Sequence, residues 1–121
     1  MSHVQTIKTG ITNMLKERGN GLTFVDISSL SGFTGEASIE VENKNIHLWF
    51  HCSTDAVEAI KQLLNEKLIE IQPTSHLTYV VDGQIPRYPV AKQDRPYKTP
   101  RWMPAQIVKG NGSIHETKAA V

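Results

Sequence analysis

The sequence predicts an α+β fold, and three observations point to that class. Apolar residues three and four positions apart, the spacing typical of helices, mark residues 4–18, 24–30 and 54–68. Apolar and polar residues alternate, as they do in strands, after the second and the third of these helices. From Ile85 onward this periodicity ends, and the five prolines from Pro86 to Pro104 impose an extended, irregular path.

The first two helices are predicted together with their ends. Ser2 is expected to cap the first helix, and Gly19-Asn20-Gly21 to end it, because these residues tolerate positive φ. The second helix begins with Thr23 and Asp26, whose spacing resembles a capping box, and Gly32 ends it. The residues expected to face the core are Val4, Ile7, Ile11, Met14 and Leu15 in the first helix and Phe24, Ile27 and Leu30 in the second.

A β-hairpin is predicted in the stretch "GEASIEVENKNIHLWFHC", residues 35–52. A tight turn at Asn43-Lys44 folds two alternating strands back on each other, and one register then matches side chains on both faces. The expected pairs are Val41 with Ile46, Ile39 with Leu48, Ala37 with Phe50, Glu40 with His47, and Ser38 with Trp49. Trp49 is therefore expected on the polar face, where so large a ring needs a cover.

The third helix lies in "STDAVEAIKQLLNEKL" and is capped by Ser53 or Thr54. Asp55 and Glu58 lie in its first turn, where the helix dipole favours anions. The apolar spacing of this segment predicts one buried stripe, which is expected to consist of Val57, Ile60, Leu63, Leu64 and Leu68.

A second hairpin is predicted directly after the third helix. Residues 69–81 alternate around a turn at Pro73-Thr74-Ser75, and Asp82-Gly83 closes the second strand. The expected cross-strand neighbours are Ile69 and Ile71 in the first strand and Leu77 and Tyr79 in the second.

The order helix, short helix, helix, hairpin resembles that of a winged helix-turn-helix domain. The stretch "STDAVEAIKQLLNEKLIEIQPTSHLTYVVDG" is similar to the recognition helix and wing of bacterial regulators of that family. The resemblance covers about residues 4–82 and implies a winged-helix-like domain into which the hairpin of residues 35–52 is inserted. The run "YKTPRWMP" resembles one found in small proteins of bacteria and of mobile elements such as phages.

These observations divide the chain into a winged-helix-like domain (1–84), an extended basic strap (85–110) and a frayed tail (111–121). Residues 1–82 carry six Lys or Arg and ten Asp or Glu, whereas residues 83–121 carry seven and two. A basic strap beside an acidic domain has two interpretations: the strap packs on or beside the domain, which is the arrangement we expect, or it binds a polyanion.

Several function classes are disfavoured by the sequence. The single Cys52 excludes an intramolecular disulfide and favours the cytoplasm, and we expect neither a signal peptide nor a membrane span. Nucleophile and phosphate-loop motifs are missing, so we expect no enzyme activity and no cofactor. A metal site is not expected either, because His47 and His51, if both face one side of an extended strand, lie about 13 Å apart.

Two hypotheses for function remain. The first is a nucleic-acid-binding or regulatory protein, in which cations contact phosphates while Tyr88, Tyr97 and Trp102 stack on bases. Its expected contact residues are Lys61, Thr74, Ser75, His76, Arg87, Arg95, Lys98 and Arg101.

The alternative is a protein-interaction adaptor without DNA binding. It is favoured by the acids at the start of the third helix, since acids in that place repel phosphates instead of reading bases. Its expected partner-binding residues are Trp49, Asp55, Glu58 and Trp102. The oligomeric state is open, with a homodimer among the options.

Overall fold

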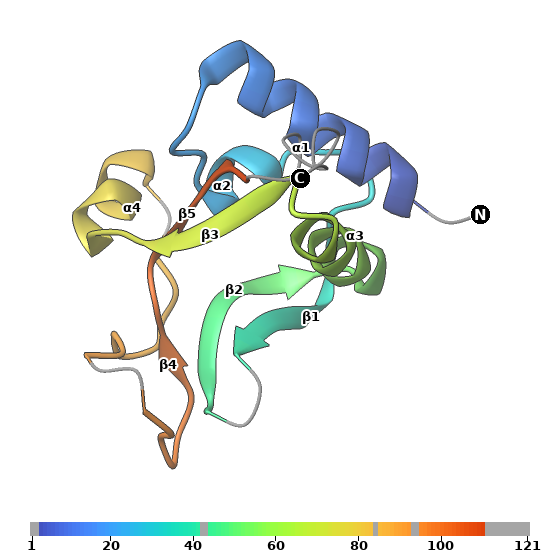
Figure 1. Cartoon of the computed structure of the whole chain (residues 1–121). Helices are drawn as coiled ribbons and strands as arrows, with labels where there is room; N and C mark the ends of the chain where they lie inside the picture. The colour runs from blue at the N-terminus through green and yellow to red at the C-terminus, as the bar shows by residue number, and fades with distance from the viewer. Residues whose placement is uncertain (1–2, 42–43, 84, 93–94, 111–121) are drawn as a thin grey trace, which may run out of the picture.

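The structure, a computed structural model, describes residues 3–41, 44–83, 85–92 and 95–110 and has the predicted α+β class (Figure 1). Ser2 and the predicted tail 111–121 lie outside these residues. None of the described helices combines the length and the apolar character that crossing a membrane requires. The helices are α1 (Val4–Arg18), α2 (Phe24–Ile27), α3 (Thr54–Asn65) and α4 (His76–Asp82). The strands are β1 (Thr34–Val41), β2 (Ile46–Cys52), β3 (Ile69–Pro73), β4 (Arg101–Trp102) and β5 (Ala105–Lys109).

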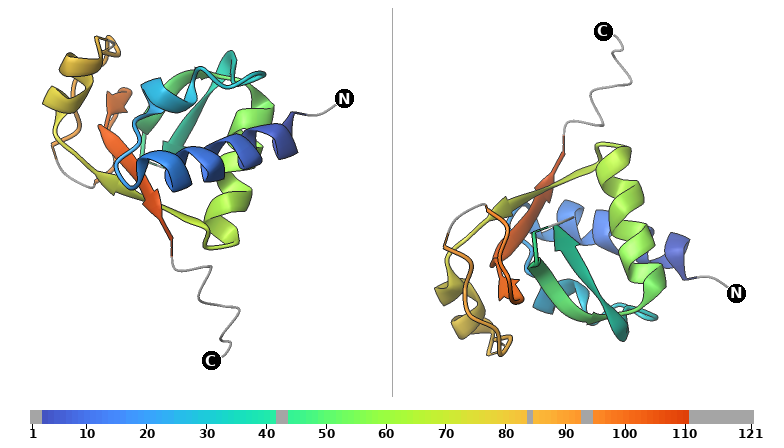
Figure 2. Two further views of the ribbon diagram at one scale, coloured as in Figure 1. Left: turned by 90° about the horizontal axis from the view of Figure 1, so that it is seen from above. Right: turned by 90° about the horizontal axis from the view of Figure 1, so that it is seen from below.

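Helix α1 forms where the sequence predicts it and packs on α3 (Figure 2). Its N-cap is His3, whose backbone N–H donates to the Asp55 carboxylate at 2.8 Å, so a side chain of α3 satisfies the start of α1. The helix is followed by Gly19, at φ 81°. The fully buried side chains of α1 are Ile7, Ile11 and Leu15.

Helices α2 and α3 also begin as predicted. The Thr23 hydroxyl accepts from the Asp26 N–H and the Asp26 carboxylate from the Thr23 N–H, which confirms the capping box. Ser53 caps α3 by accepting from the N–H of Ala56. The buried stripe of α3 is narrower than expected, because Leu64 is 38% exposed and Leu68, at 37% exposed, lies beyond the end of the helix at Asn65.

Strands β1 and β2 form the predicted antiparallel hairpin, but only its turn end has the predicted register. The pairs Val41 with Ile46 and Glu40 with His47 are confirmed. The expected pairs Ile39 with Leu48, Ala37 with Phe50 and Ser38 with Trp49 are wrong. Irregularities along β1 shift the register, so that Ile39 lies opposite Trp49 and Ala37 opposite Cys52.

These shifts turn Trp49 into the core, so its predicted place on a polar face is wrong. The side chain is 8% exposed, and its ring centroid lies 6.0 Å from that of Phe24 and 5.3 Å from that of Tyr79. The cover that this ring requires therefore comes from α2 and α4.

The second predicted hairpin is wrong, because residues 76–82 form α4 instead of a strand. Ser75 caps this helix by accepting from the Leu77 N–H, and Gly83 ends it in the left-handed conformation at φ 82°. Strand β3 pairs instead with the distant β5, antiparallel, from Ile69 opposite Lys109 to Pro73 opposite Ala105. The prediction chose the nearest partner in sequence, whereas the strand that completes this sheet comes from the C-terminal part of the chain.

The proline-rich segment, whose described residues are 85–92 and 95–104, runs along the hairpin. Its backbone N–H groups donate to hairpin carbonyls, from Tyr97 to Lys44 at 3.0 Å and from Arg101 to Asn45 at 2.8 Å. Strand β4 in this segment pairs parallel with β2. Trp102 is 1% exposed and meets Tyr79 edge-on, at 5.2 Å between ring centroids.

One edge of β5 pairs with β3. The backbone groups on its other edge are hydrogen-bonded to single residues instead of to a further strand. Leu22 exchanges backbone hydrogen bonds with Ile107 on that edge. The buried Tyr79 hydroxyl donates to the Ala105 carbonyl at 2.7 Å and accepts from the Phe24 N–H at 3.0 Å. A single hydroxyl therefore satisfies a strand edge and the first N–H of α2.

Candidate functional site

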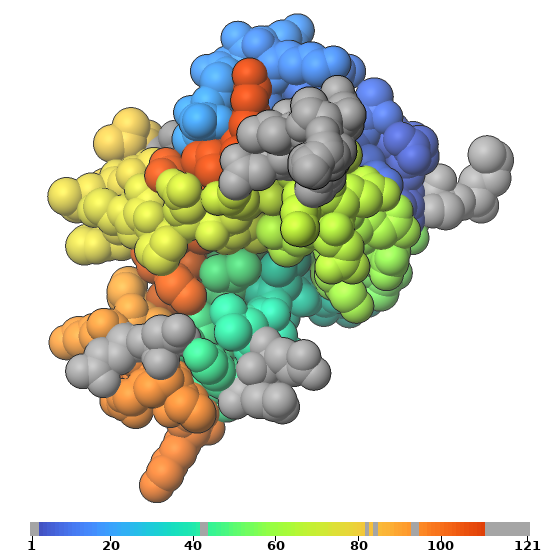
Figure 3. Space-filling view, in the orientation of Figure 1, coloured from blue at the N-terminus to red at the C-terminus, as the bar shows by residue number. Residues whose placement is uncertain are grey.

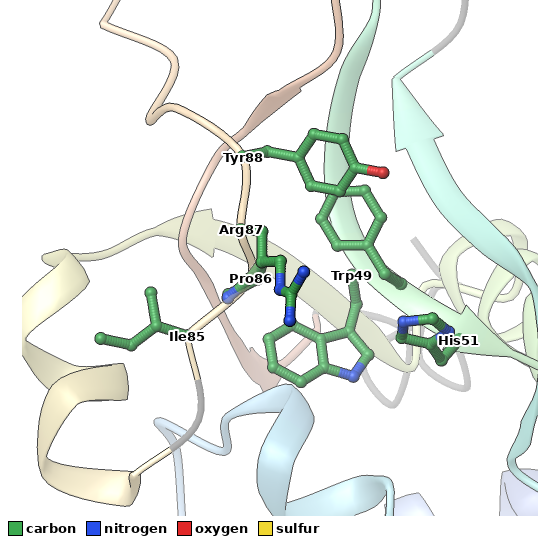
Figure 4. A pocket seen from close by; sticks show the side chains of 7 residues that line it. Trp49, His51, Ile85, Pro86, Arg87 and Tyr88 are labelled. Carbon is green, nitrogen blue, oxygen red and sulfur yellow. The ribbon is translucent and has the colours of Figure 1, made fainter.

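A cleft of about 490 Å³ opens between β2 and the start of the proline-rich segment (Figure 4). Side chains from both segments surround it, and they are Trp49, Phe50 and His51 from β2 and Ile85, Pro86, Arg87 and Tyr88 from the residues after α4. The register shifts in the hairpin create this arrangement, because they send Trp49 inward and leave Phe50 only half-buried.

Phe50 and Tyr88 of the cleft wall belong to a stack of three rings, whose third member is His47. The centroids of Phe50 and Tyr88 lie 4.4 Å apart with an interplanar angle of 13°, and that of His47 lies 5.1 Å from Phe50. Tyr88 is 42% exposed, so part of this stack is accessible to solvent. An accessible aromatic stack can extend by one more planar ring, such as a nucleic-acid base.

A smaller hollow of about 250 Å³ continues from the cleft. It shares Phe50, His51 and Tyr88 with the cleft and adds His47, Pro100 and residues 36–38 of β1. Pro100, which directly precedes Arg101 in the sequence, is the lining residue nearest along the chain to the cationic part of the segment.

Two guanidinium groups lie over one ring in that cationic part. The Cζ atoms of Arg95 and Arg101 are 4.3 Å and 4.7 Å from the centroid of the Tyr97 ring. The Tyr97 hydroxyl accepts from the Lys92 N–H at 3.0 Å, which fixes the ring that holds both cations. Lys98, next in sequence, is exposed.

His47 and Cys52, two residues near the cleft that could take part in metal or nucleophile chemistry, are both held within the hairpin. The Nδ1 atom of His47 lies 3.0 Å from the Ser38 hydroxyl, and its Nε2 atom lies 3.6 Å from the Glu40 carboxylate. Burial raises the pKa of the Cys52 thiol to about 12, so the thiol is protonated at neutral pH. Within the described ranges, no three His, Cys, Asp or Glu side chains are placed to hold a metal ion.

Four of the eight residues predicted to contact nucleic acid lie on the proline-rich segment: Arg87, Arg95, Lys98 and Arg101. The structure places the other four elsewhere. Lys61 is exposed on α3, beside a different groove. The other three, Thr74, Ser75 and His76, were expected at a wing tip and instead lead into α4.

The residues predicted to bind a protein partner do not form one exposed face. Trp49 and Trp102 belong to the core. Asp55 accepts from the His3 N–H, and Glu58 accepts from the Gln62 side chain at 3.0 Å. Among the described residues, the four most exposed large apolar side chains lie on and just after α4, a helix at the end of the molecule opposite the start of α1 (Figures 1 and 2). They are Leu77, Val80, Val81 and Ile85.

Sequence reasoning missed Phe50 and His51 as cleft residues. Simple alternation assigned Phe50 to the core, and only the register shifts reverse this assignment. His51 has a φ of 59°, which is unusual for a residue other than glycine. The amino-acid sequence around His51 does not predict this backbone conformation.

Comparison of the chain with protein-family models, with curated proteins and with solved structures gave no match.

Proposed function

We propose that the chain is a non-enzymatic, cytoplasmic binding module of the winged-helix type, from a bacterium or a phage, that binds single-stranded nucleic acid. In this proposal β3 and β5 correspond to the two strands of the wing, and α4 with the proline-rich segment is an insertion between them. The ligand lies in the cleft and along the proline-rich segment.

One observation carries the proposal: the proline-rich segment presents two aromatic units beside cations, and the ring of the first unit lines both hollows. The first unit is Tyr88 on its ring stack, with Arg87 in the same cleft. The second is Tyr97 with Arg95 and Arg101. Proteins that bind single strands combine such rings, on which bases stack, with cations that follow the backbone.

The charges around the hollows and on α3 favour a single strand over a duplex. Among the described residues that line the two hollows, the only carboxylate is that of Glu36. Helix α3, which would enter the major groove of a duplex, carries Asp55 and Glu58 in its first two turns. These carboxylates disfavour the close approach of phosphates.

The experiment is a titration of fluorescently labelled single-stranded DNA and RNA, followed by anisotropy at increasing salt. If Arg87, Arg95, Lys98 and Arg101 each neutralise one phosphate, log K falls with log salt with a slope of about −2.8. The affinity then drops roughly 50-fold between about 50 and 200 mM salt. Replacing Arg95, Lys98 and Arg101 together by alanine reduces the slope to about −0.7.

Two control variants distinguish a loss of stacking or of charge from a general loss of folded structure. Tyr88→Leu removes the exposed ring and is expected to weaken binding about 5- to 150-fold, whereas Tyr88→Phe keeps the ring and the affinity. Lys16→Ala removes an exposed cation of α1 and leaves the salt slope unchanged. Failure to bind at about 50 mM salt, or tighter binding of a duplex than of a single strand, removes the proposal.

A protein-interaction adaptor is the second candidate, and the apolar side chains of α4 favour it. Leu77, Val80 and Val81 are 60%, 47% and 86% exposed, and Ile85 adds to the same patch at 54%. Grouped apolar side chains on a surface mark interaction sites. In a pull-down, Val81→Glu is expected to release a partner that the triple alanine variant of the cationic segment retains.

A further inference from the structure

A separate groove of about 530 Å³ lies between the β1–β2 hairpin, α3 and β3, and it shares no lining residue with the cleft or its smaller neighbour. Figure 3 shows the side of the molecule on which the hairpin borders α3 and β3. The wall is mainly aliphatic. It combines side chains of all three elements with Met103, which lies between β4 and β5; among the others are Val41, Leu48, Val57, Leu64 and Ile71.

The face of α3 that borders the groove joins apolar and cationic groups. Val57, Lys61 and Leu64 are four and three residues apart and therefore lie on one side of the helix. Leu64 is 38% exposed there, so the apolar wall is accessible to solvent. The stem of Lys61 adds methylene groups to this wall while its ammonium group stays in water.

The charges of the groove favour an anion. Its described lining contains two lysines, Lys44 and Lys61, and one carboxylate, that of Glu40. The Glu40 carboxylate also lies 3.6 Å from the Nε2 atom of His47, which is not part of this lining. A ligand that suits this surface is apolar over most of its length and negative at one end.

We propose that this groove binds a single-chain amphiphile with an anionic head, of the fatty-acid type. The alkyl chain lies against the aliphatic wall, and the head group pairs with the ammonium group of Lys61. This site does not depend on nucleic-acid binding in the cleft, since the two sets of lining residues are distinct.

The methionine methyl groups provide a direct test by NMR with methyl-labelled protein. Met103 lines the groove, whereas Met14 lies on α1 and does not. Decanoate is expected to shift the Met103 methyl resonance to saturation and to leave that of Met14 unchanged. In the series octanoate, decanoate, dodecanoate, the affinity rises by up to about fourfold for each added methylene. A Met103 resonance that stays in place throughout the titration overturns the proposal.

Head-group variants decide whether the charge matters. Nonyltrimethylammonium, which has the same nine-carbon tail and a positive head, is expected to bind more weakly than decanoate by up to about fivefold. Lys61→Ala lowers decanoate affinity by about the same factor, while Lys61→Arg and the distant Lys16→Ala retain it. Leu64→Gln weakens all three acids together, because it removes part of the apolar wall. Equal affinity for the two head groups, or an unchanged affinity in Lys61→Ala, shows unspecific apolar binding and overturns the proposal.

Discussion

The Tyr79 hydroxyl offers the sharpest test of the fold. Replacing Tyr79 by Phe removes one oxygen atom and leaves the ring in place among Trp49 and Trp102. It also removes two hydrogen bonds, at 2.7 Å to the Ala105 carbonyl and at 3.0 Å from the Phe24 N–H. Strand β3 does not replace either bond, because it pairs with the opposite edge of β5.

The size of the effect follows from the burial of these groups. Tyr79 is 0% exposed and Ala105 1%, so water does not take over the lost bonds. A buried backbone group that loses its partner destabilises a protein by about 1 to 3 kcal/mol. For two such groups we expect the free energy of unfolding to fall by about 3 kcal/mol and Tm by about 10 °C.

The assay is urea unfolding followed by both tryptophan fluorescence and circular dichroism. The ring centroids of Trp49 and Trp102 lie 5.3 Å and 5.2 Å from that of Tyr79, so fluorescence reports on this part of the core. Tyr88→Phe is the matched control, because it removes a hydroxyl from a ring that is 42% exposed, and it is expected to change stability by less than about 0.5 kcal/mol. If Tyr79→Phe is as stable as this control, the hydroxyl does not join α2 to β5 and the reasoning is refuted.

Further predictions concern backbone contacts and the cysteine. Gly35→Ala is expected to destabilise by about 3 kcal/mol, because a Cβ there would lie 2.6 Å from the Cα of Ser53. At Gly83 φ is 82° and no atom lies within 4 Å of an added Cβ, so Gly83→Ala is expected to lower the free energy of unfolding by only about 1 kcal/mol. Urea unfolding that shows Gly83→Ala to be less stable than Gly35→Ala would contradict this prediction. Since burial raises the pKa of Cys52 from 9.0 to about 12, the native thiol is expected to resist Ellman's reagent at about pH 8 until the protein unfolds. The unfolded chain loses this proton first, so stability is expected to decline as pH rises from about 9 toward 12, and Cys52→Ser is expected to reduce that slope.

The elements predicted correctly from the sequence are those whose signals are local. The capping box at Thr23 and Asp26 needs only residues three positions apart, and the helix dipole and the Ser53 cap mark α3 in the same way. The turn end of the hairpin is local too, and there the pair Val41 and Ile46 has the predicted register.

The errors arise where distant parts of the chain decide between local alternatives. The letters "SHLTYVVDG" alternate like a strand, but they also carry a helix N-cap at Ser75 and a helix end at Gly83. The choice between strand and helix depends on β5, which occupies the edge of β3 that a local hairpin would have used. The Tyr79 ring then faces the core from a helix, where its hydroxyl reaches Ala105.

The candidate cleft was partly accessible to sequence reasoning. The cations Arg87, Arg95 and Arg101 were predicted because their segment lacks apolar periodicity and is rich in basic residues. Phe50 was missed because bulges in a strand leave no signal in composition or alternation, and a shift of one residue exchanges the two faces.

The pairing of β3 with β5 also sets the order in which parts of this chain can fold during synthesis. The hairpin and α3 can assemble as soon as they leave the ribosome, whereas Ile69 and Ile71 wait for a strand translated about thirty residues later. Until Lys109 has emerged, the nascent polypeptide presents an unpaired strand edge and an open core, the state in which chaperones bind and aggregation begins.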